Sequence, residues 1–433
     1  MQSPSQAPVV TQSDVVQATG LEVSYPELIV NGLFTSGSAG WNLSDALVTS
    51  SELRPGGKAM DVGWRVFQSL GTAGLKPGAS YRLEVQARNA SSGKTTRLAV
   101  IFRTASGEPF RTHEVSVVSS SYARYVIEFT APNYVANAEF QVLTNGTRAR
   151  VDSASLRQRD AIEQTEPIVS AVGSFVPAGY LLAFNDEFNG SSLNRAKWFT
   201  RFIYAGGTSD RLNDEQQRYR DNSNHVVADG VLKLIARRVR TGSADGIDYE
   251  SGMIRSDWTT RYGYFEARVR MPAGIGLSSA FWLNSDVSEF GRLAWPPEID
   301  IFEFVNNGVE DTRDMIHSGV VDARGLAASY AFKHPSFDST WTFWRAPYDF
   351  SGGWHTIGAE WTPDALTLYV DGERIYTRNV RWNYSDGSAA APAHIILNLA
   401  VGGQWAGRYG VDSSVIPQAL EIDWVRAYRR EFN

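Results

Sequence analysis

The residues of this chain that are best suited to chemistry are three carboxylates in the stretch 297–304, which reads Pro-Glu-Ile-Asp-Ile-Phe-Glu-Phe. β-Branched and aromatic residues separate the acids, which predicts a strand that is buried on at least one face. Three acids can also form a solvated strand face, but the uniformly apolar residues between them and the tryptophans nearby in the sequence disfavour that interpretation. Acids grouped without a basic residue are costly unless their protonation states differ.

The spacing of the three acids predicts an irregular strand. Side chains alternate along a strand, so Glu298 and Asp300 point the same way, while Glu303 would point to the other face. A β-bulge around Ile301 and Phe302 would return Glu303 to the face of the other acids, and bulges recur beside active sites. Long side chains that lean together across a concave sheet could then bring the two glutamate carboxyls to about 5.5 Å, the separation in retaining glycosidases.

Two close glutamates can divide the work of a double displacement. Like charges held close raise one pKa, which separates a nucleophile from an acid. We predict that Glu298 attacks the anomeric carbon, and that Glu303 first protonates the leaving oxygen and then activates water. Asp300, between them, would hydrogen-bond to Glu298 and help to hold the two pKa values apart.

The motif Glu298–Glu303 resembles the signature of glycoside hydrolase family 16, in the bulged form shared by laminarinases, agarases and carrageenases. Residues 175–430 contain further stretches that are similar to those of the family and occur in the same order. These stretches are Asn185–Gly190, Asn213–Gln217, Ser251–Gly252, Tyr262–Arg268, Ala280–Leu283, Tyr369–Gly372, Asn398–Gly403 with Trp405, and Glu421–Tyr428. Together with short alternating runs, they imply an all-β jelly-roll sandwich with an open substrate cleft on its concave sheet.

The resemblance also implies where the sugar binds. Asn213 and Glu215 are similar to family residues that hydrogen-bond sugar hydroxyls. Trp282 and Trp405 are similar to platforms whose indole faces pack on pyranose rings, with a core position as the alternative for each. The expected substrate-binding residues are Asn213, Glu215, Trp282, Trp295, His317, Gln404 and Trp405.

Metal ligation is expected only away from the reaction. No pair of histidines and no set of cysteines has the spacing of a zinc site, so we expect no cofactor for catalysis. Members of family 16 often carry a structural calcium on the convex face, and the resemblance places Glu187 and Asp423 there as oxygen ligands. The alternative is that both acids only make local hydrogen bonds.

Length and composition limit the number of domains and the partners. A chain of 433 residues is long for one compact domain, which favours two. The net charge of −6 gives no electrostatic footprint for nucleic acid and disfavours a heavily sulfated glycan. The chain has no cysteine, and no apolar run approaches the ~20 residues that span a bilayer. We expect a polysaccharide partner, no nucleic acid, no membrane span and a monomer.

Residues 25–158 are expected to form a first β-sandwich, because short alternating runs recur between turn residues without a helical period. The stretches Asn31–Trp41 and Leu75–Tyr81 resemble a jelly-roll carbohydrate-binding module of the family 4 and 9 type; a purely structural module is the alternative. The expected strands include Leu28–Val30, Tyr81–Gln86, Thr96–Phe102, Tyr125–Phe129, Ala138–Val142 and Val151–Leu156.

The remaining segments complete the domain plan. Residues 1–24 are rich in Gln, Ser, Val and Pro, which predicts a flexible leader without signal-peptide character. Residues 159–174 predict a linker and residues 175–433 the catalytic domain. Because a polymer-degrading enzyme must reach its substrate, we expect a secreted or periplasmic protein whose signal peptide has been removed.

The favoured function is therefore a retaining endo-β-1,3-glucanase, a laminarinase. Mixed-linkage β-1,3-1,4-glucan or another bacterial or algal polysaccharide is the alternative substrate, since Ser278-Ser279 stands where laminarinases carry Trp-Pro and residues 323–353 form an aromatic insertion. A transglycosylase would keep the same acids, and a non-hydrolytic β-glucan-binding protein is the alternative of another class. If the first domain only anchors the enzyme to insoluble polymer, removing residues 1–160 would spare activity on soluble oligosaccharides.

Overall fold

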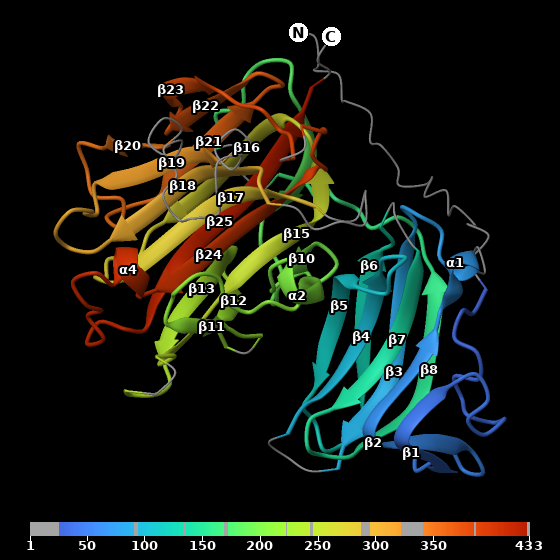
Figure 1. Ribbon diagram of the computed structural model, residues 1–433. Coiled ribbons are helices and arrows are strands. Elements are labelled where there is room, and N and C mark those ends of the chain that lie inside the picture. The colour runs from blue at the N-terminus through green and yellow to red at the C-terminus, as the bar shows by residue number, and fades with distance from the viewer. Residues whose placement is uncertain are drawn as a thin grey trace, which may run out of the picture.

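The computed structural model describes residues 26–90, 94–132, 136–168, 172–221, 223–242, 246–286, 295–321, 341–384 and 387–430. Its strands form two β-sandwiches that follow one another along the chain, blue to teal and then green to red in Figure 1. The described helices have only four residues each, so the all-β fold class predicted from alternating patterns is confirmed. The expected leader, 1–24, and most of the insertion at 323–353 lie outside the described residues.

The first sandwich contains strands β1–β8. Alternation explains their formation: in β3, every second residue from Tyr81 to Asn89 is buried. Strand β2 pairs with β8 along Met60–Val62 and with β7 along Arg65–Ser69, so it passes from one layer to the other. The elements are β1 (Asn42–Ser50), β2 (Lys58–Ser69), α1 (Gly71–Gly74), β3 (Ser80–Asn89), β4 (Thr96–Arg103), β5 (Pro109–Val117), β6 (Ala123–Thr130), β7 (Asn137–Thr144) and β8 (Ala149–Gln158).

The runs expected from residue 81 onward lie in strands β3, β4, β6, β7 and β8, whereas the prediction of a strand at Leu28–Val30 is wrong. There, Glu27 makes only an isolated bridge to Arg157, and the chain turns where the Phe34 N–H donates to the Asn31 carbonyl at 3.0 Å. The Asn-Gly pair at the start of this turn favours such a reversal over strand extension.

The second sandwich packs two sheets face to face. In the described ranges, one sheet has seven strands in the order β10-β15-β24-β17-β18-β19-β20. The other has ten, in the order β11-β14-β13-β25-β16-β21-β22-β23, with β12 beside β13 and β9 beside β25. Apolar side chains from both sheets, such as Phe265, Phe281, Phe302 and Leu397, form one core between them.

The elements of the second sandwich follow in chain order. They are β9 (Leu181–Asp186), β10 (Trp198–Phe199), α2 (Tyr204–Gly207), β11 (Gln217–Tyr219), β12 (His225–Ala228), β13 (Val231–Arg238), β14 (Tyr249–Ser251), β15 (Met253–Thr260), β16 (Gly263–Arg270), β17 (Leu277–Ser285), β18 (Glu298–Asn306), β19 (Met315–Val321), β20 (Trp341–Arg345), β21 (His355–Trp361), β22 (Ala365–Val370), β23 (Glu373–Asn379), β24 (Ala393–Val401), α4 (Gly403–Ala406) and β25 (Gln418–Arg429). None of the helices in these ranges is long and apolar enough to cross a membrane.

Strand β18, which carries the three acids, contains the predicted bulge. Against β17, Asp300 pairs with Trp282 and Phe302 pairs with Phe281, so Ile301 is the extra residue. Against β19, the register also shifts between Asp300 and Glu303. The physical cause lies in the core, where Ile301 and Phe302 are both fully buried although they are neighbours in the strand.

The predicted linker lies along the second sandwich. The Asn185 N–H donates to the Gln164 carbonyl at 3.1 Å, and the Lys197 ammonium contacts Glu166 at 3.0 Å. Further on, Phe175 donates its N–H to Glu266 at 3.0 Å. The beginning of the segment is hydrogen-bonded to the first sandwich, where Arg159 and Ile162 donate their N–H groups to Ser80, and its later described part is attached to β9 and its neighbours.

Candidate active site

The three acids share one face of the seven-stranded sheet. Residues paired directly across neighbouring strands point to the same side, and the partners of the acids on β17 are Asn284, Trp282 and Ala280, each two positions apart. We call this side of the sheet the acid face. Its cross-strand rows are Glu298 with Asn284 and His394, Asp300 with Trp282 and Ile396, and Glu303 with Ala280 and His317.

The surroundings of the two glutamates differ electrostatically. Burial raises the pKa of Glu298 to about 7, while hydrogen bonds from Trp295 and Asp300 act to lower it. Burial, together with the charges of Glu298 and Glu215, raises the pKa of Glu303 to about 8. Since only Glu298 has donors that favour its ionised form, Glu298 loses its proton first and Glu303 keeps its proton longer.

Asp300 is the most strongly perturbed of the acids. Burial, followed by the charges of Glu298 and Glu303, raises its pKa well above the usual range, so Asp300 stays protonated and can donate to Glu298. Trp295 supplies the second donor to Glu298, with Nε1 3.0 Å from Oε2. Among the described residues, Glu303 Oε2 and Asp300 Oδ2 are buried without a hydrogen-bond partner.

Two loops predicted to bind sugar lie side by side. Asp214 Oδ2 accepts a hydrogen bond from the Gln404 N–H at 2.8 Å, which joins the loop of Asn213 and Glu215 to that of Trp405. Glu215 accepts from Gln217 Nε2 at 2.7 Å, and burial raises the pKa of Glu215 to about 7. The structure thus places Asn213, Glu215 and the loop of Gln404 together beside the acid face.

His317 and Trp405 are joined by a residue that sequence reasoning missed. Asp311 Oδ1 lies 2.7 Å from His317 Nε2, and Asp311 Oδ2 accepts from Trp405 Nε1 at 2.8 Å. Burial alone would raise the pKa of Asp311, but hydrogen bonds from His317 and Trp405 outweigh it and the pKa is lowered. The two rings meet edge to face with centroids 4.9 Å apart. No sequence pattern pairs Asp311 with a tryptophan so far along the chain.

The two tryptophans predicted as sugar platforms are exposed to different extents. Trp405 is 37% exposed, as a stacking surface requires. Trp282 is only 6% exposed, because Phe202 packs against it at 5.8 Å, and its Nε1 donates to Asn398 at 2.8 Å. Trp282 therefore packs beneath the segment that contains Phe202. This position is closer to the core role that was the alternative to a sugar platform.

The predicted calcium ligands do not fit a calcium site. Both oxygens of Glu187 are occupied by the buried guanidinium of Arg426, at 2.9 and 2.7 Å. Asp423 pairs instead with Arg268. No group of three or more metal-ligating side chains occurs in the described part of the chain. Arginines thus pair with both carboxylates that were predicted to bind calcium. This agrees with the alternative that the two acids make only local contacts.

A β-sandwich with two glutamates and an aspartate on one sheet face is the arrangement of a glycoside hydrolase that works with paired carboxylates. Residues 181–430, which run from the start of β9 to just beyond β25, match the sequence model of the GH16 domain of β-porphyranases A–D. This match covers more than half of the chain. The chain belongs to glycoside hydrolase family 16, whose enzymes need no catalytic cofactor.

Curated relatives match a similar share of the chain. A β-glucanase of Rhodothermus marinus is 32% identical over 265 residues, which are 57% of this chain and 85% of the relative. A glucan endo-1,3-β-glucosidase of Cryptopygus antarcticus is 31% identical over 282 residues, 61% of this chain and 97% of the relative. Among solved structures, the laminarinase of Rhodothermus marinus is 30% identical, covers 58% of this chain and 98% of its own, and has a TM-score of 0.47.

The Asp311 contacts predict a positioning effect on substrate binding. Asp311→Asn keeps one acceptor oxygen and loses the charge-assisted contact to the second ring, so we expect kcat/KM to fall about 10-fold, mainly through KM. Steady-state kinetics on a soluble polysaccharide would measure this. Asp314→Asn, a nearby acid that pairs with the exposed Arg345, serves as the matched control and should change KM little. Equal KM values in both variants would contradict the positioning effect.

The Glu187–Arg426 pair predicts a stability effect that does not depend on calcium. Glu187→Gln removes the ion-pair partner of the buried Arg426, so we expect the free energy of unfolding to fall by about 3 kcal/mol. Denaturant unfolding in calcium and in EDTA should give the same loss. Glu310→Gln, which removes an exposed pair with Arg408, should cost less than about 1 kcal/mol. A loss seen only in calcium would restore Glu187 as a metal ligand.

Proposed function

We propose that this chain is a retaining endo-hydrolase of β-1,3-glucan. The observation that carries the proposal is the bulge at Ile301, which places Glu298 and Glu303 on one sheet face with a protonated Asp300 between them. The intact acids also distinguish the chain from a non-hydrolytic glucan-binding protein, which would have no need of three costly carboxylates on one face.

In the proposed mechanism, ionised Glu298 attacks the anomeric carbon and forms a covalent glycosyl-enzyme. The donors Trp295 and Asp300 lower the pKa of Glu298 and orient its carboxylate for this attack. Protonated Glu303 gives its proton to the glycosidic oxygen of the leaving sugar, then takes a proton from the water that cleaves the intermediate. As the charge on Glu298 is consumed, the repulsion that raised the pKa of Glu303 decreases, so Glu303 releases its proton more readily and is ionised when it acts as the base in the second step.

The choice of β-1,3-glucan rests on the relatives' activities. The Cryptopygus antarcticus relative is named a glucan endo-1,3-β-glucosidase, and the chain spans nearly all of it. Mixed-linkage glucan is a further candidate within the same class, since two relatives from Rhizobium meliloti are named endo-1,3-1,4-β-glycanases at 28% and 29% identity. We propose Asn213, Glu215, Trp405 and His317 as the residues that hold the sugar, with Gln404 and Trp295 beside them.

A second candidate substrate is porphyran, because the family model that matches residues 181–430 describes β-porphyranases. The net charge of −6 disfavours a heavily sulfated glycan, which favours a neutral glucan between the two. Ser278-Ser279, in place of the expected Trp-Pro, lies on β17, where Ser279 is buried.

We further propose that the first sandwich binds carbohydrate, and that the protein is monomeric and acts in the periplasm or outside the cell. Trp64 on β2 is 53% exposed, and an exposed indole is the kind of surface on which sugar rings stack. A polymer too large to enter a cell requires the enzyme to meet it outside.

The function is tested by reducing-sugar release from a panel of laminarin, barley mixed-linkage glucan, porphyran, agarose, carrageenan and xyloglucan. We expect the wild type to release sugar from laminarin, and Glu298→Gln to lower the rate by about 10³-fold or more, because the nucleophile is lost. Release from porphyran alone would move the substrate to the second candidate. Activity that survives in the folded Glu298→Gln variant would remove Glu298 from the mechanism.

The two glutamate pKa values predict a bell-shaped dependence of kcat/KM on pH. Activity falls below the pKa of Glu298, where the nucleophile is protonated, and falls above the pKa of Glu303, where the acid is ionised. The maximum is therefore expected between about pH 7 and 8. On an activated aryl glycoside, whose leaving group needs no proton, Glu303→Gln should remove the alkaline fall. An alkaline fall unchanged in Glu303→Gln would assign the acid to another group.

A further inference from the structure

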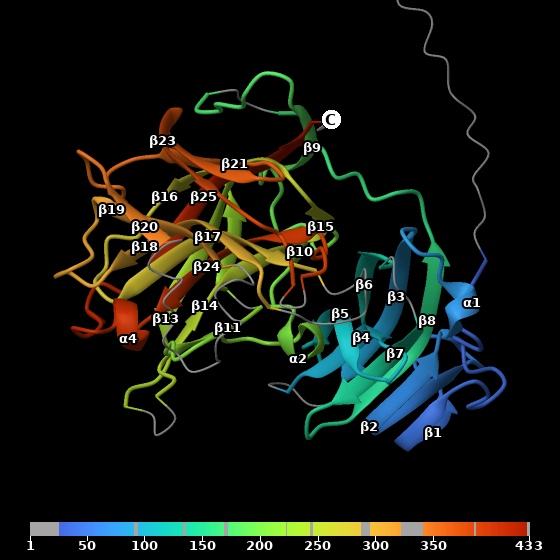
Figure 2. The same cartoon turned by 45° about the horizontal axis from the view of Figure 1, so that its top comes forward.

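The two sandwiches are joined by a buried contact. Figure 2 shows β5 of the first sandwich next to α2 of the second, as does the view from the other angle. Thr112 on β5 donates its hydroxyl to the Gly206 carbonyl at 2.5 Å. A Cβ on Gly206 would lie 2.7 Å from Pro109, and one on Gly207 3.0 Å from the Thr112 nitrogen. Only glycines allow the two backbones to approach this closely.

Side chains of the second sandwich extend the core of the first. Ile203, which precedes α2, is 4% exposed and belongs to the apolar core of the first sandwich. Tyr204 packs against that core and also against the cluster on the acid face. The ring of His113 on β5 lies 4.5 Å from that of Phe199 on β10. Such contacts are those of a domain interior rather than of a tethered module.

Arg111 of the first sandwich forms ion pairs with the second sandwich at this junction. Its guanidinium lies 3.0 Å from Asp286 and 3.3 Å from Asp257, and all three side chains are nearly inaccessible to solvent. Asp286 also contacts His394 Nε2 at 3.0 Å. A cation from the first sandwich thus faces two buried acids of the second, which it shares with the buried Arg255 of β15, and its loss would leave these acids with one cation between them.

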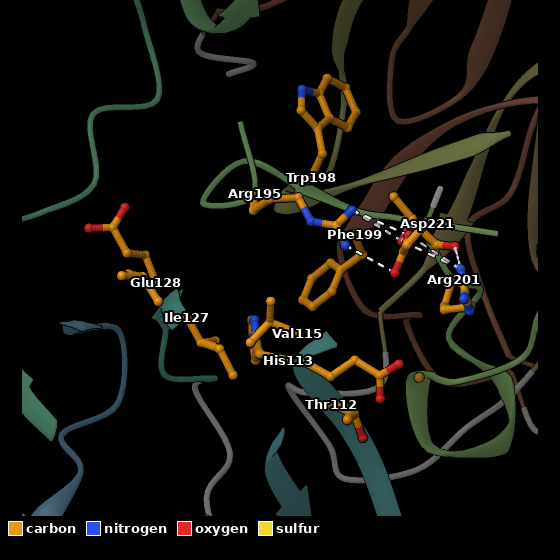
Figure 3. A pocket seen from close by; sticks show the side chains of 14 residues that line it. Thr112, His113, Val115, Ile127, Glu128, Arg195, Trp198, Phe199, Arg201 and Asp221 are labelled. Atoms are coloured by element: carbon orange, nitrogen blue, oxygen red, sulfur yellow. Dashed lines mark hydrogen bonds and ion pairs between the residues drawn. The ribbon is translucent and has the colours of Figure 1, made fainter. Parts of the chain in front are cut away.

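A pocket lies at the same junction (Figure 3). Its charged lining side chains are paired, so none of them requires a ligand. Figure 3 shows Arg195 and Arg201 turned toward Asp221, which they contact at 3.1 and 3.5 Å. Residues of β5 and β6 line its other side, and none of the three acids lines it. The pocket is therefore a gap at the edge of the interface between the two sandwiches.

The junction continues into the acid face. Asp286 follows the last residue of β17 and contacts His394, which stands in the same cross-strand row as Asn284 and Glu298. The Asn284 amide donates to the Tyr204 hydroxyl at 2.9 Å. From Arg111 to Glu298, the contacts therefore run along neighbouring positions of one sheet face.

The segment between the junction and the sugar-binding loop covers that face. Phe202 packs on Trp282 at 5.8 Å and on Tyr219 at 5.4 Å, and Leu212 packs against the same cluster. Immediately after Leu212 come Asn213 and Glu215. The segment 202–215 is thus held at one end by the first sandwich and carries proposed sugar ligands at the other.

We propose that the first sandwich is a positioning part of the catalytic unit: through Arg111 and Thr112, it holds the segment 202–215 on the acid face and so sets the affinity for substrate. This role differs from anchoring to insoluble polymer, because it acts on soluble substrates too. It rests on the proposed hydrolase function, but it does not depend on which polysaccharide of the panel the wild type cleaves.

The test compares full-length variants on the soluble substrate that the wild type cleaves. Arg111→Ala should raise KM by about 5-fold with a smaller change in kcat, a coupling of the size that packed networks carry. Arg111→Lys, which keeps a cation, should recover part of the affinity, and Thr112→Val should raise KM about 2-fold. Hydrogen exchange should become faster in residues 202–215 of Arg111→Ala.

The matched control is Arg54→Ala. Arg54 also neutralises a buried acid, Asp152, at 2.7 Å, but within the first sandwich and away from the junction. Arg54→Ala should therefore destabilise the first sandwich while KM and exchange in residues 202–215 stay unchanged. If Arg111→Ala fails to fold, Thr112→Val and Arg111→Lys decide the question alone. Folded junction variants with wild-type KM, or an equal rise of KM in Arg54→Ala, would overturn the proposal. An inactive wild type would instead count against the proposed function.

Discussion

Repulsion between three carboxylates on one sheet face is the constraint on which this structure depends. A regular strand would have separated Glu303 from Glu298 and Asp300. The core prevents this, because Ile301 and Phe302 are both fully buried and only a bulge accommodates two consecutive inward residues. The protein tolerates the resulting concentration of acids by keeping Asp300 protonated and by giving donors to Glu298 alone. The bulge in β18 therefore determines both the packing of the core and the division of protonation states on the acid face.

The same face is completed by contacts from distant parts of the chain. Glu215 lies near enough to Glu303 for its charge to raise that pKa, and Asp311 joins His317 on β19 to Trp405 beyond β24. The first sandwich reaches this face as well, through Arg111 and the buried acids at the end of β17. Removal of a module that only anchors the enzyme would spare activity on soluble substrates. Removal of this sandwich is instead expected to lower that activity.

The sequence was sufficient to predict the bulge, because the acids and the apolar residues of β18 lie within a few positions of one another and their spacing fits only one irregular strand. Alternation likewise predicted most strands of the first sandwich, but failed at Leu28–Val30, where turn chemistry at Asn31 outweighs three apolar residues. The arginine partners of the predicted calcium ligands were missed for another reason: Glu187 and Asp423 have suitable oxygens, and nothing local indicates that Arg426 and Arg268 pair with them. The Asp311–Trp405 and Arg111–Asp286 contacts were missed because their partners lie 94 and 175 residues apart, a distance over which residue types carry no signal.

The most direct test of the central claim is to trap the covalent intermediate. A 2-deoxy-2-fluoro glycosyl fluoride of the cleaved glycan should react with the wild type and leave a sugar on one carboxylate, which peptide mass spectrometry can locate. The label is predicted on Glu298, and the wild type should release its first product with the β-configuration, as seen by NMR. A label on Asp300 or Glu303, or a first product of inverted configuration, would contradict the division of roles that the bulged strand imposes.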